Sequence, residues 1–275
     1  MPLGSVEKGI RKDAIMTQRF IPSDADIVSR CRAITKSGSY MILPRANRVE
    51  NVLPEFEKTL AQVLVTPSLG ARFIQHELLL ESEGGTRKPI QDGLEHFFYV
   101  LEGGAELDFS GKKYELAQGG FAYLPGGSSF QMRNFLNQKS RVFWTKRRFR
   151  PSESLKPEPI ISNENDVPAY PCDTYMEQHL IPYDVDVAYD LAFNLLNFEP
   201  GVYFGFVESH IMEHGLYMLE GRGIYWLNGD YHEVQEDDFI YMAPYCPQFF
   251  YATGWVKGRY LIYKDVNRDF NEDLP

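Results

Sequence analysis

The sequence predicts an all-β protein that consists of two copies of one β domain. Short runs of aromatic and β-branched residues, such as residues 97–101, 120–124 and 239–242, alternate with turns rich in Gly, Pro, Asn and Asp. Short strands at such close spacing are typical of a sandwich or barrel. Long helical periodicity is hard to find, and residues 52–65 could hold one short helix at most.

An internal repeat indicates the duplication. Residues 95–103 follow the pattern Glu-His-x-x-Tyr-x-Leu-Glu-Gly, and residues 213–221 repeat it at an offset of 214 − 96 = 118 residues. The same offset, without gaps, matches residues 121–123 to residues 239–241. One copy in each half of the chain is the signature of a duplicated all-β unit.

The repeat and the local composition divide the chain of 275 residues into four segments. The stretch from about residue 150 to residue 171 is rich in Pro, Ser, Asn and Glu, which is typical of a linker. We therefore expect an N-terminal arm with edge strands over 1–50, a first domain over 51–150, a linker over 151–171 and a second domain over 172–275.

Charge and composition exclude several classes of partner. A net charge of -10 argues against nucleic acid, which requires clustered positive charge. The one basic cluster, Lys-Arg-Arg-Phe-Arg at residues 146–150, is interpreted as the exit of a strand into a solvated loop. No run of about 18 apolar residues occurs, so no membrane span is expected.

Cysteine usage predicts a reducing compartment. The three cysteines are few, odd in number and widely spaced, so neither a disulfide framework nor a Cys-x-x-Cys metal pair is implied. Residues 1–8 lack the apolar segment of a signal peptide. We expect a cytoplasmic protein.

The residues with the clearest chemistry lie in the second half. Glu208, His210 and His214 stand at positions i, i+2 and i+6, and even steps along a strand point to the same face. A carboxylate and two imidazoles that leave coordination positions open are typical of a catalytic metal site. The alternative is a half-buried strand whose polar side chains are satisfied by hydrogen bonds.

Both halves resemble the cupin superfamily. Its first motif has two His, a Glu and a strand ending in Tyr-x-Leu-x-Gly, and its second has Gly, five residues, Pro and a nearby His. Here Glu208 replaces the first His, His214 replaces the Glu, and Gln248, shortly after Pro244, stands about where the last His belongs. The resemblance covers roughly residues 60 to 265. It implies a bicupin, a pair of small double-sheet jelly-roll barrels of the double-stranded β-helix type.

The exchanged ligand set resembles the (S)-ureidoglycine aminohydrolase family, bicupins of allantoin degradation. Further segments that look like this family are residues 146–149, 223–225, 259–265 and 267–269. The resemblance implies a metal site and favours Mn²⁺, while other divalent metals stay open; the implied ligands are Glu208, His210, His214 and Gln248. Two nitrogens and two oxygens suit Mn²⁺ better than a thiolate-preferring metal.

The same resemblance implies a hydrolase that releases ammonia from a small ureido substrate. Glu208 would move a proton as well as bind metal, Lys264 would pair with the substrate carboxylate, and Tyr225 and Tyr260 would donate hydrogen bonds. From spacing alone, the two tyrosines fit a plain core equally well, and the lysine fits a solvated turn. Two other functions stay open: a non-catalytic bicupin that binds a small carboxylate, or another metal enzyme such as a dioxygenase or isomerase. We also expect a homo-oligomer.

The first half provides an internal comparison. At the 118-residue offset, the four predicted ligands of the second half correspond to Ile90, Asp92, His96 and Phe130. Only one imidazole and one carboxylate remain, so we predict no metal in the first half. His96 is then a residue of the barrel lining or core.

Overall fold

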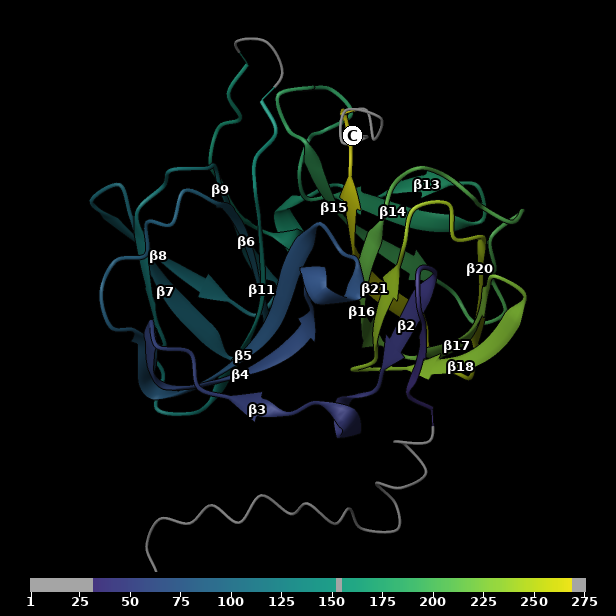
Figure 1. Ribbon diagram of the computed structural model, residues 1–275, viewed down its shortest axis with the longest axis horizontal. Coiled ribbons are helices and arrows are strands. Elements are labelled where there is room, and N and C mark those ends of the chain that lie inside the picture. The colour runs from purple at the N-terminus through teal and green to yellow at the C-terminus, as the bar shows by residue number, and fades with distance from the viewer. Residues whose placement is uncertain (1–31, 152–154, 269–275) are drawn as a thin grey trace, which may run out of the picture.

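The computed structural model describes residues 32–151 and 155–268, and strands dominate this part of the chain (Figure 1). The all-β prediction is confirmed: the only helices among the described residues are the short 3-10 turns Arg45–Asn47, Pro67–Leu69 and Glu164–Asp166. None of these turns is long enough to cross a membrane. Cys31 and Asp269 lie outside the described residues, while Cys172 and Cys246 are free thiols.

Strands of the first half form one ten-stranded sheet that curls into a barrel, with order β12-β9-β6-β11-β5-β10-β7-β8 and with β4 and β3 attached to β5. Their bounds are β3 (Glu50–Asn51), β4 (Phe56–Val65), β5 (Phe73–Thr86), β6 (Glu95–Glu102), β7 (Gly104–Phe109), β8 (Lys112–Ala117), β9 (Gly120–Leu124), β10 (Phe130–Arg133), β11 (Ser140–Arg147) and β12 (Ile160–Asn163).

The second barrel consists of an eight-stranded sheet, order β1-β2-β19-β16-β21-β15-β14-β13, and a three-stranded sheet, order β18-β17-β20. Strands β1 and β2 of this barrel come from the N-terminal part of the chain. The bounds of the strands are β1 (Ile34–Lys36), β2 (Tyr40–Leu43), β13 (Tyr170–Cys172), β14 (Tyr175–His179), β15 (Leu191–Phe198), β16 (His214–Glu220), β17 (Arg222–Leu227), β18 (Asp230–Gln235), β19 (Phe239–Met242), β20 (Gln248–Thr253) and β21 (Gly258–Asp265).

The two barrels lie side by side, and strands β14–β21 of the second repeat strands β4–β11 of the first (Figure 1). Strand β11 begins at Ser140 and β21 at Gly258, which is again an offset of 118 residues. The glycine that ends the repeated motif turns the chain in both copies, since Gly103 and Gly221 adopt φ values of 76° and 73°. That left-handed conformation favours glycine.

Two local expectations are made more precise by the structure. Residues 56–65 form strand β4 along most of β5, so the short helix does not occur; pairing with a long neighbouring strand decides the conformation here. The basic cluster is the end of a strand, as expected, but not all of it is solvated. Lys146 and Arg147 belong to β11, and Arg147 is buried against Asp190, with Nη2 3.0 Å from Oδ2.

The strand that precedes each barrel joins the sheet of the other barrel. Strand β2, which comes before the first barrel, pairs with β19 of the second. Strand β12, which lies within the predicted linker 151–171, pairs with β9 of the first barrel. The exchange ties the halves together through backbone hydrogen bonds.

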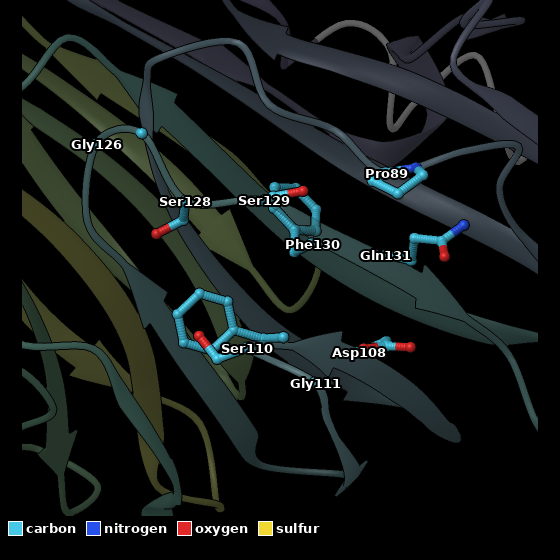
Figure 2. A pocket seen from close by; sticks show the side chains of 11 residues that line it. Pro89, Asp108, Ser110, Gly111, Gly126, Ser128, Ser129, Phe130 and Gln131 are labelled. Carbon is cyan, nitrogen blue, oxygen red and sulfur yellow. The ribbon is translucent and has the colours of Figure 1, made fainter.

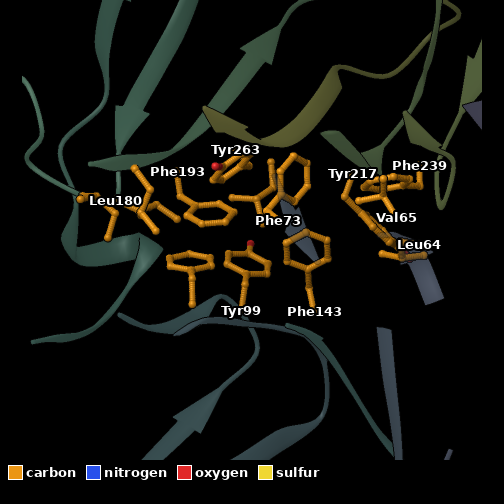
Figure 3. Packing of buried hydrophobic residues seen from close by; sticks show 14 of the residues in the cluster. Leu64, Val65, Phe73, Tyr99, Phe143, Leu180, Phe193, Tyr217, Phe239 and Tyr263 are labelled. Atoms are coloured by element: carbon orange, nitrogen blue, oxygen red, sulfur yellow. The ribbon is translucent and has the colours of Figure 1, made fainter. Parts of the chain in front are cut away.

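Aromatic side chains fill the contact between the barrels (Figure 3). The rings of Phe97 and Phe193 stack with centroids 3.6 Å apart, and Phe143 meets Tyr217 edge-on at 5.7 Å. Burial of one such side chain contributes about 1.5–3 kcal/mol to stability. The two barrels therefore share one core.

Polar groups at this contact follow the same repeat. Tyr99 of the first barrel and Arg259 of the second meet at the carboxylate of Glu164. Tyr217 and Arg141, at offsets of 217 − 99 = 118 and 259 − 141 = 118, meet at Asp237. Each barrel thus supplies a tyrosine to the arginine of the other, which fixes how the barrels face each other.

Candidate metal centre

The predicted ligands come from three segments of the second barrel. His214 begins β16 and Gln248 begins β20, whereas Glu208 forms an isolated bridge with Gln248. The strand expected for residues 208–214 is therefore wrong, because β16 starts only at the last of them. Bridge hydrogen bonds hold Glu208 beside Gln248, at 2.9 and 2.8 Å, and the carbonyl of His210 accepts from Tyr245 N at 2.7 Å.

The four side chains nevertheless come together. His210 Nε2 lies 3.2 Å from His214 Nε2 and 3.2 Å from Gln248 Nε2. Glu208 Oε2 lies 4.0 Å from His210 Nε2. Donor atoms bound to one ion at about 2.1 Å are roughly 3 Å apart, so the imidazole pair already has the spacing of metal ligands.

His214 is held in the tautomer that a metal ligand requires. Its Nδ1 lies 3.0 Å from the carbonyl oxygen of Tyr263, and a carbonyl only accepts, so Nδ1 carries the hydrogen. Burial, and then the neighbouring charges of His210 and Lys264, lower the pKa of His214 well below its ordinary value. Nε2 therefore keeps a free lone pair that faces His210, as in many metal-binding histidines.

Glu208 and His210 lie at the mouth of the barrel. Their side chains are 27% and 26% exposed, whereas His214 is buried. Burial is the main cause that lowers the pKa of His210, although the charge of Glu208 opposes it. A small molecule can therefore reach this pair from solvent, and His210 stays neutral at neutral pH.

Gln248 can supply the fourth donor. Its side chain is buried, Tyr225 donates to Oε1 at 3.4 Å, and Nε2 faces His210. A half-turn of the amide brings Oε1 toward the imidazoles and leaves Nε2 to donate to the Tyr225 hydroxyl oxygen. The amide is thus compatible with an oxygen ligand.

Within residues 32–151 and 155–268, no three His, Cys, Asp or Glu side chains are close enough to hold a metal as they stand. The distance that exceeds ligand spacing is the 4.0 Å between Glu208 and His210. Because Glu208 is partly exposed, rotation of its side chain can close this gap. Two imidazoles, an amide oxygen and a carboxylate suit a borderline or hard divalent ion.

Lys264 lies beside this group. It pairs with His214 across β16 and β21, so both side chains point to the same face of the sheet. It is not a solvated turn lysine: it belongs to β21, its side chain is 20% exposed, and Nζ lies 3.7 Å from Glu177 Oε1.

Tyr225 and Tyr260 are both core residues and neighbours of the site. Both are fully buried, and their ring centroids are 6.5 Å apart. Burial is the main cause that raises the pKa of each hydroxyl, so both stay protonated. The Tyr260 hydroxyl forms no well-aligned hydrogen bond among the described residues, although the Tyr225 hydroxyl acts on it at close range, so it can bond to a ligand.

Glu177, on β14, is a residue of this site that the sequence did not indicate. Asn194 Nδ2 donates to its Oε1 at 2.7 Å, and His179 Nε2 lies at 3.6 Å. Burial alone would raise the pKa of Glu177, but His179 and the charge of Lys264 outweigh it and lower the pKa to about 2. Glu177 therefore stays ionised beside Lys264. No motif surrounds it that could have marked it.

A cleft of about 590 Å³ lies elsewhere, on the first barrel (Figure 2). It is formed by the segments 108–111 and 126–131 with Pro89, and it contains none of the predicted site residues. Its wall residue Phe130 corresponds to Gln248, and Phe130 bridges Ile90 just as Gln248 bridges Glu208.

His96, the counterpart of His214, uses both of its ring nitrogens. Trp144 Nε1 donates to Nδ1 at 3.2 Å, and an indole only donates, so Nδ1 is the acceptor. Nε2 then carries the hydrogen and donates to Asp92 Oδ1 at 3.1 Å. This is the opposite tautomer to His214. The prediction that the first barrel holds no metal stays a prediction, and this hydrogen bonding favours it.

No family model matches the chain, but individual relatives do. An (S)-ureidoglycine aminohydrolase of Escherichia coli K12 is 33% identical over 241 residues, which are 86% of this chain and 92% of the relative. An (S)-ureidoglycine aminohydrolase of Arabidopsis thaliana is 32% identical over 247 residues, 89% of this chain and 81% of the relative.

Solved structures agree with this likeness. The crystal structure of protein Ylba from E. coli matches with a TM-score of 0.81 at 32% identity and covers 90% of this chain and 99% of that chain. Oxalate decarboxylase of Bacillus subtilis matches with a TM-score of 0.65 at 11% identity, over 88% of this chain and 82% of that one, and shows the shared bicupin fold alone. With relatives above 30% identity over most of both chains, this chain belongs to the (S)-ureidoglycine aminohydrolase family.

Proposed function

We propose that this protein is a metal-dependent hydrolase that converts (S)-ureidoglycine and water to (S)-ureidoglycolate and ammonia. The names of its relatives support the reaction. One observation carries the metal dependence: the lone pair of His214 Nε2 faces His210 Nε2 at 3.2 Å, with Gln248 and Glu208 alongside.

Glu208, His210, His214 and Gln248 would hold the metal, and the resemblance to the family favours Mn²⁺. When bound, such an ion supplies Lewis acidity and a template for the substrate. A carboxylate binds a metal in its ionised form. Glu208 is therefore suited to accept the proton that is released when water adds to the substrate.

Lys264 would bind the substrate carboxylate. It is the cationic side chain paired with His214 across the sheet, so it lies one strand away from the ligand group. Glu177 forms an ion pair with it, with Oε1 3.7 Å from Lys264 Nζ. Tyr260, whose hydroxyl forms no well-aligned hydrogen bond among the described residues, would donate to a substrate oxygen, and Tyr225 would support Gln248.

The reaction breaks one C–N bond and forms one C–O bond. The substrate carries an amine, a carboxylate and a ureido group on one carbon. The substrate amine enters protonated, and the lone pair of the ureido nitrogen helps to expel it as ammonia. Water then adds to the same carbon, its proton passes to the ionised Glu208 carboxylate, and that proton is handed on to the released ammonia.

Ammonia release from freshly prepared ureidoglycine tests this function. The manganese-loaded protein is expected to release ammonia, while Glu208→Ala and His214→Ala reduce release to the uncatalysed background because each removes a ligand. Glu233→Ala, a matched change at an exposed glutamate of β18, is expected to keep the full rate. Full activity in both ligand variants would refute the assignment.

A further inference from the structure

The first barrel keeps the lysine of the active site. Lys146 and Lys264 are separated by 264 − 146 = 118 residues. Lys146 pairs with His96 across β6 and β11, as Lys264 pairs with His214 across β16 and β21. The first barrel has therefore lost the metal ligands but retains the cation that stands beside them.

The two lysines differ in their counter-ion. Lys264 is neutralised by Glu177, and the corresponding position of the first barrel is Thr59, which carries no charge. The Lys146 side chain forms no hydrogen bond or direct ion pair with any described residue; its Nζ lies 4.8 Å from the centroid of the Trp144 ring, and Asp92 acts on it only through space. Because the side chain is only partly exposed, this ammonium lacks both full hydration and a directly paired anion.

Other polar groups gather around the same indole ring. His76 stacks on Trp144 at 5.3 Å, is 5% exposed, and has no partner for Nδ1 among the described residues. Asp92, whose side chain is 34% exposed, accepts from His96 at 3.1 Å. The cluster thus offers one cation without a directly paired anion, one unused ring nitrogen and one carboxylate.

Charge states at neutral pH follow from these surroundings. Burial, and then the charge of Lys146, lower the pKa of His76 to about 4, so His76 is neutral. The hydrogen bond from His96 is the main cause that lowers the pKa of Asp92 to about 2, so Asp92 is ionised. A ligand that matches both Lys146 and Asp92 carries a carboxylate at one end and N–H donors at the other.

We propose that the first barrel is a second, non-catalytic binding site for a small ureido acid. The carboxylate would pair with Lys146 and the ureido N–H groups would face Asp92; the choice of ligand class rests on the proposed function, since Lys264 is the model for Lys146. The ring of Phe130, a residue that lines the cleft of Figure 2, packs edge-on against His96 at 4.8 Å, while Lys146 and Asp92 are themselves partly exposed and open to a ligand from solvent. His96, with both nitrogens in use, makes the site a binding site without catalysis.

Calorimetric titration with N-carbamoylglycine, a stable ureido acid without the leaving amine, tests the proposal on the manganese-loaded full chain. Two sites per chain are expected in the wild type. Lys146→Met should leave one site and Lys264→Met should leave the other. Lys139→Met, at an exposed lysine paired with Glu81, should keep both.

A second variant guards against loss of folding. Lys146→Arg keeps the positive charge at this position, and it is expected to retain the site that Lys146→Met removes. One site per chain in the wild type, or unchanged stoichiometry in Lys146→Met, would overturn the proposal. Failure of the proposed function is distinguishable, because it appears as a wild-type protein that releases no ammonia from ureidoglycine.

Discussion

His214 and His96 stand at equivalent positions of the repeat, and one hydrogen-bonding neighbour of each determines which ring nitrogen carries the hydrogen. The carbonyl of Tyr263 accepts from His214 Nδ1 and leaves Nε2 free, whereas the indole of Trp144 donates to His96 Nδ1 and forces the hydrogen onto Nε2. At the 118-residue offset Trp144 corresponds to Ile262, which has no N–H to donate. The difference between a ligand and a structural histidine is thus a question of tautomer.

Glu177 is expected to affect substrate binding through Lys264. Glu177→Gln keeps the shape and the contact with Asn194 but removes the charge beside the ammonium. We expect KM for ureidoglycine to rise about tenfold with little change in kcat, because the ion pair that positions the Lys264 ammonium is lost. Steady-state kinetics check this, with Glu199→Gln at an exposed site as the control. An unchanged KM would contradict the role.

Glu177 also makes stability depend on pH. Its pKa in the folded protein is about 2 against an ordinary 4.5, so the carboxylate contributes stability above pH 4.5, and this stability is lost as pH falls toward 2. The wild type should lose about 3 kcal/mol more than Glu177→Gln over this range. Urea unfolding at several pH values measures the difference; parallel curves for both proteins would refute the estimate.

The four ligand candidates could be named from sequence because spacing, internal comparison and family resemblance all pointed to residues 208–214 and Gln248. The strand assumed for 208–214 is wrong, since the bridge between Glu208 and Gln248 is formed by segments that sequence periodicity cannot relate. Glu177 was missed for the same reason. It precedes its partner Lys264 by 87 residues, 264 − 177, and no local pattern links them.

At the scale of elements, the repeat of 118 residues predicted the duplicated barrel and the strands β6, β9, β16 and β19. It did not predict the exchange of β2 and β12. Which sheet an edge strand joins depends on its pairing with residues far away in the sequence. Both segments are too short for their residue pattern to predict the partner strand.

Strand β2 should stabilise the second barrel although it lies before the first. Ile42 on β2 is buried among residues of the second barrel. Ile42→Ala is expected to lower the free energy of unfolding by about 2–5 kcal/mol, whereas Thr35→Ala on the exposed face of β1 should change it little. Equilibrium urea unfolding measures both. Equal effects of the two changes would argue against the exchanged strand.

At the scale of the whole molecule, the chain has made one barrel twice and joined the copies by a shared aromatic core and exchanged strands, and the proposed metal ligands lie in the second barrel. The contact between barrels is symmetric in its tyrosines and arginines, while the two interiors differ. The two copies therefore differ in the groups inside the barrels. At equivalent positions of the repeat, the second barrel has Glu208 and Gln248 where the first has Ile90 and Phe130.

Metal content per chain tests this account most directly. After reconstitution with Mn²⁺ and removal of free ion, elemental analysis should give one metal ion per chain in the wild type, none in His214→Ala and one in His96→Ala. The two variants delete counterpart imidazoles, so they differ only in which barrel is changed. Metal retained by His214→Ala, or lost from folded His96→Ala, would contradict the assignment of the centre to the second barrel.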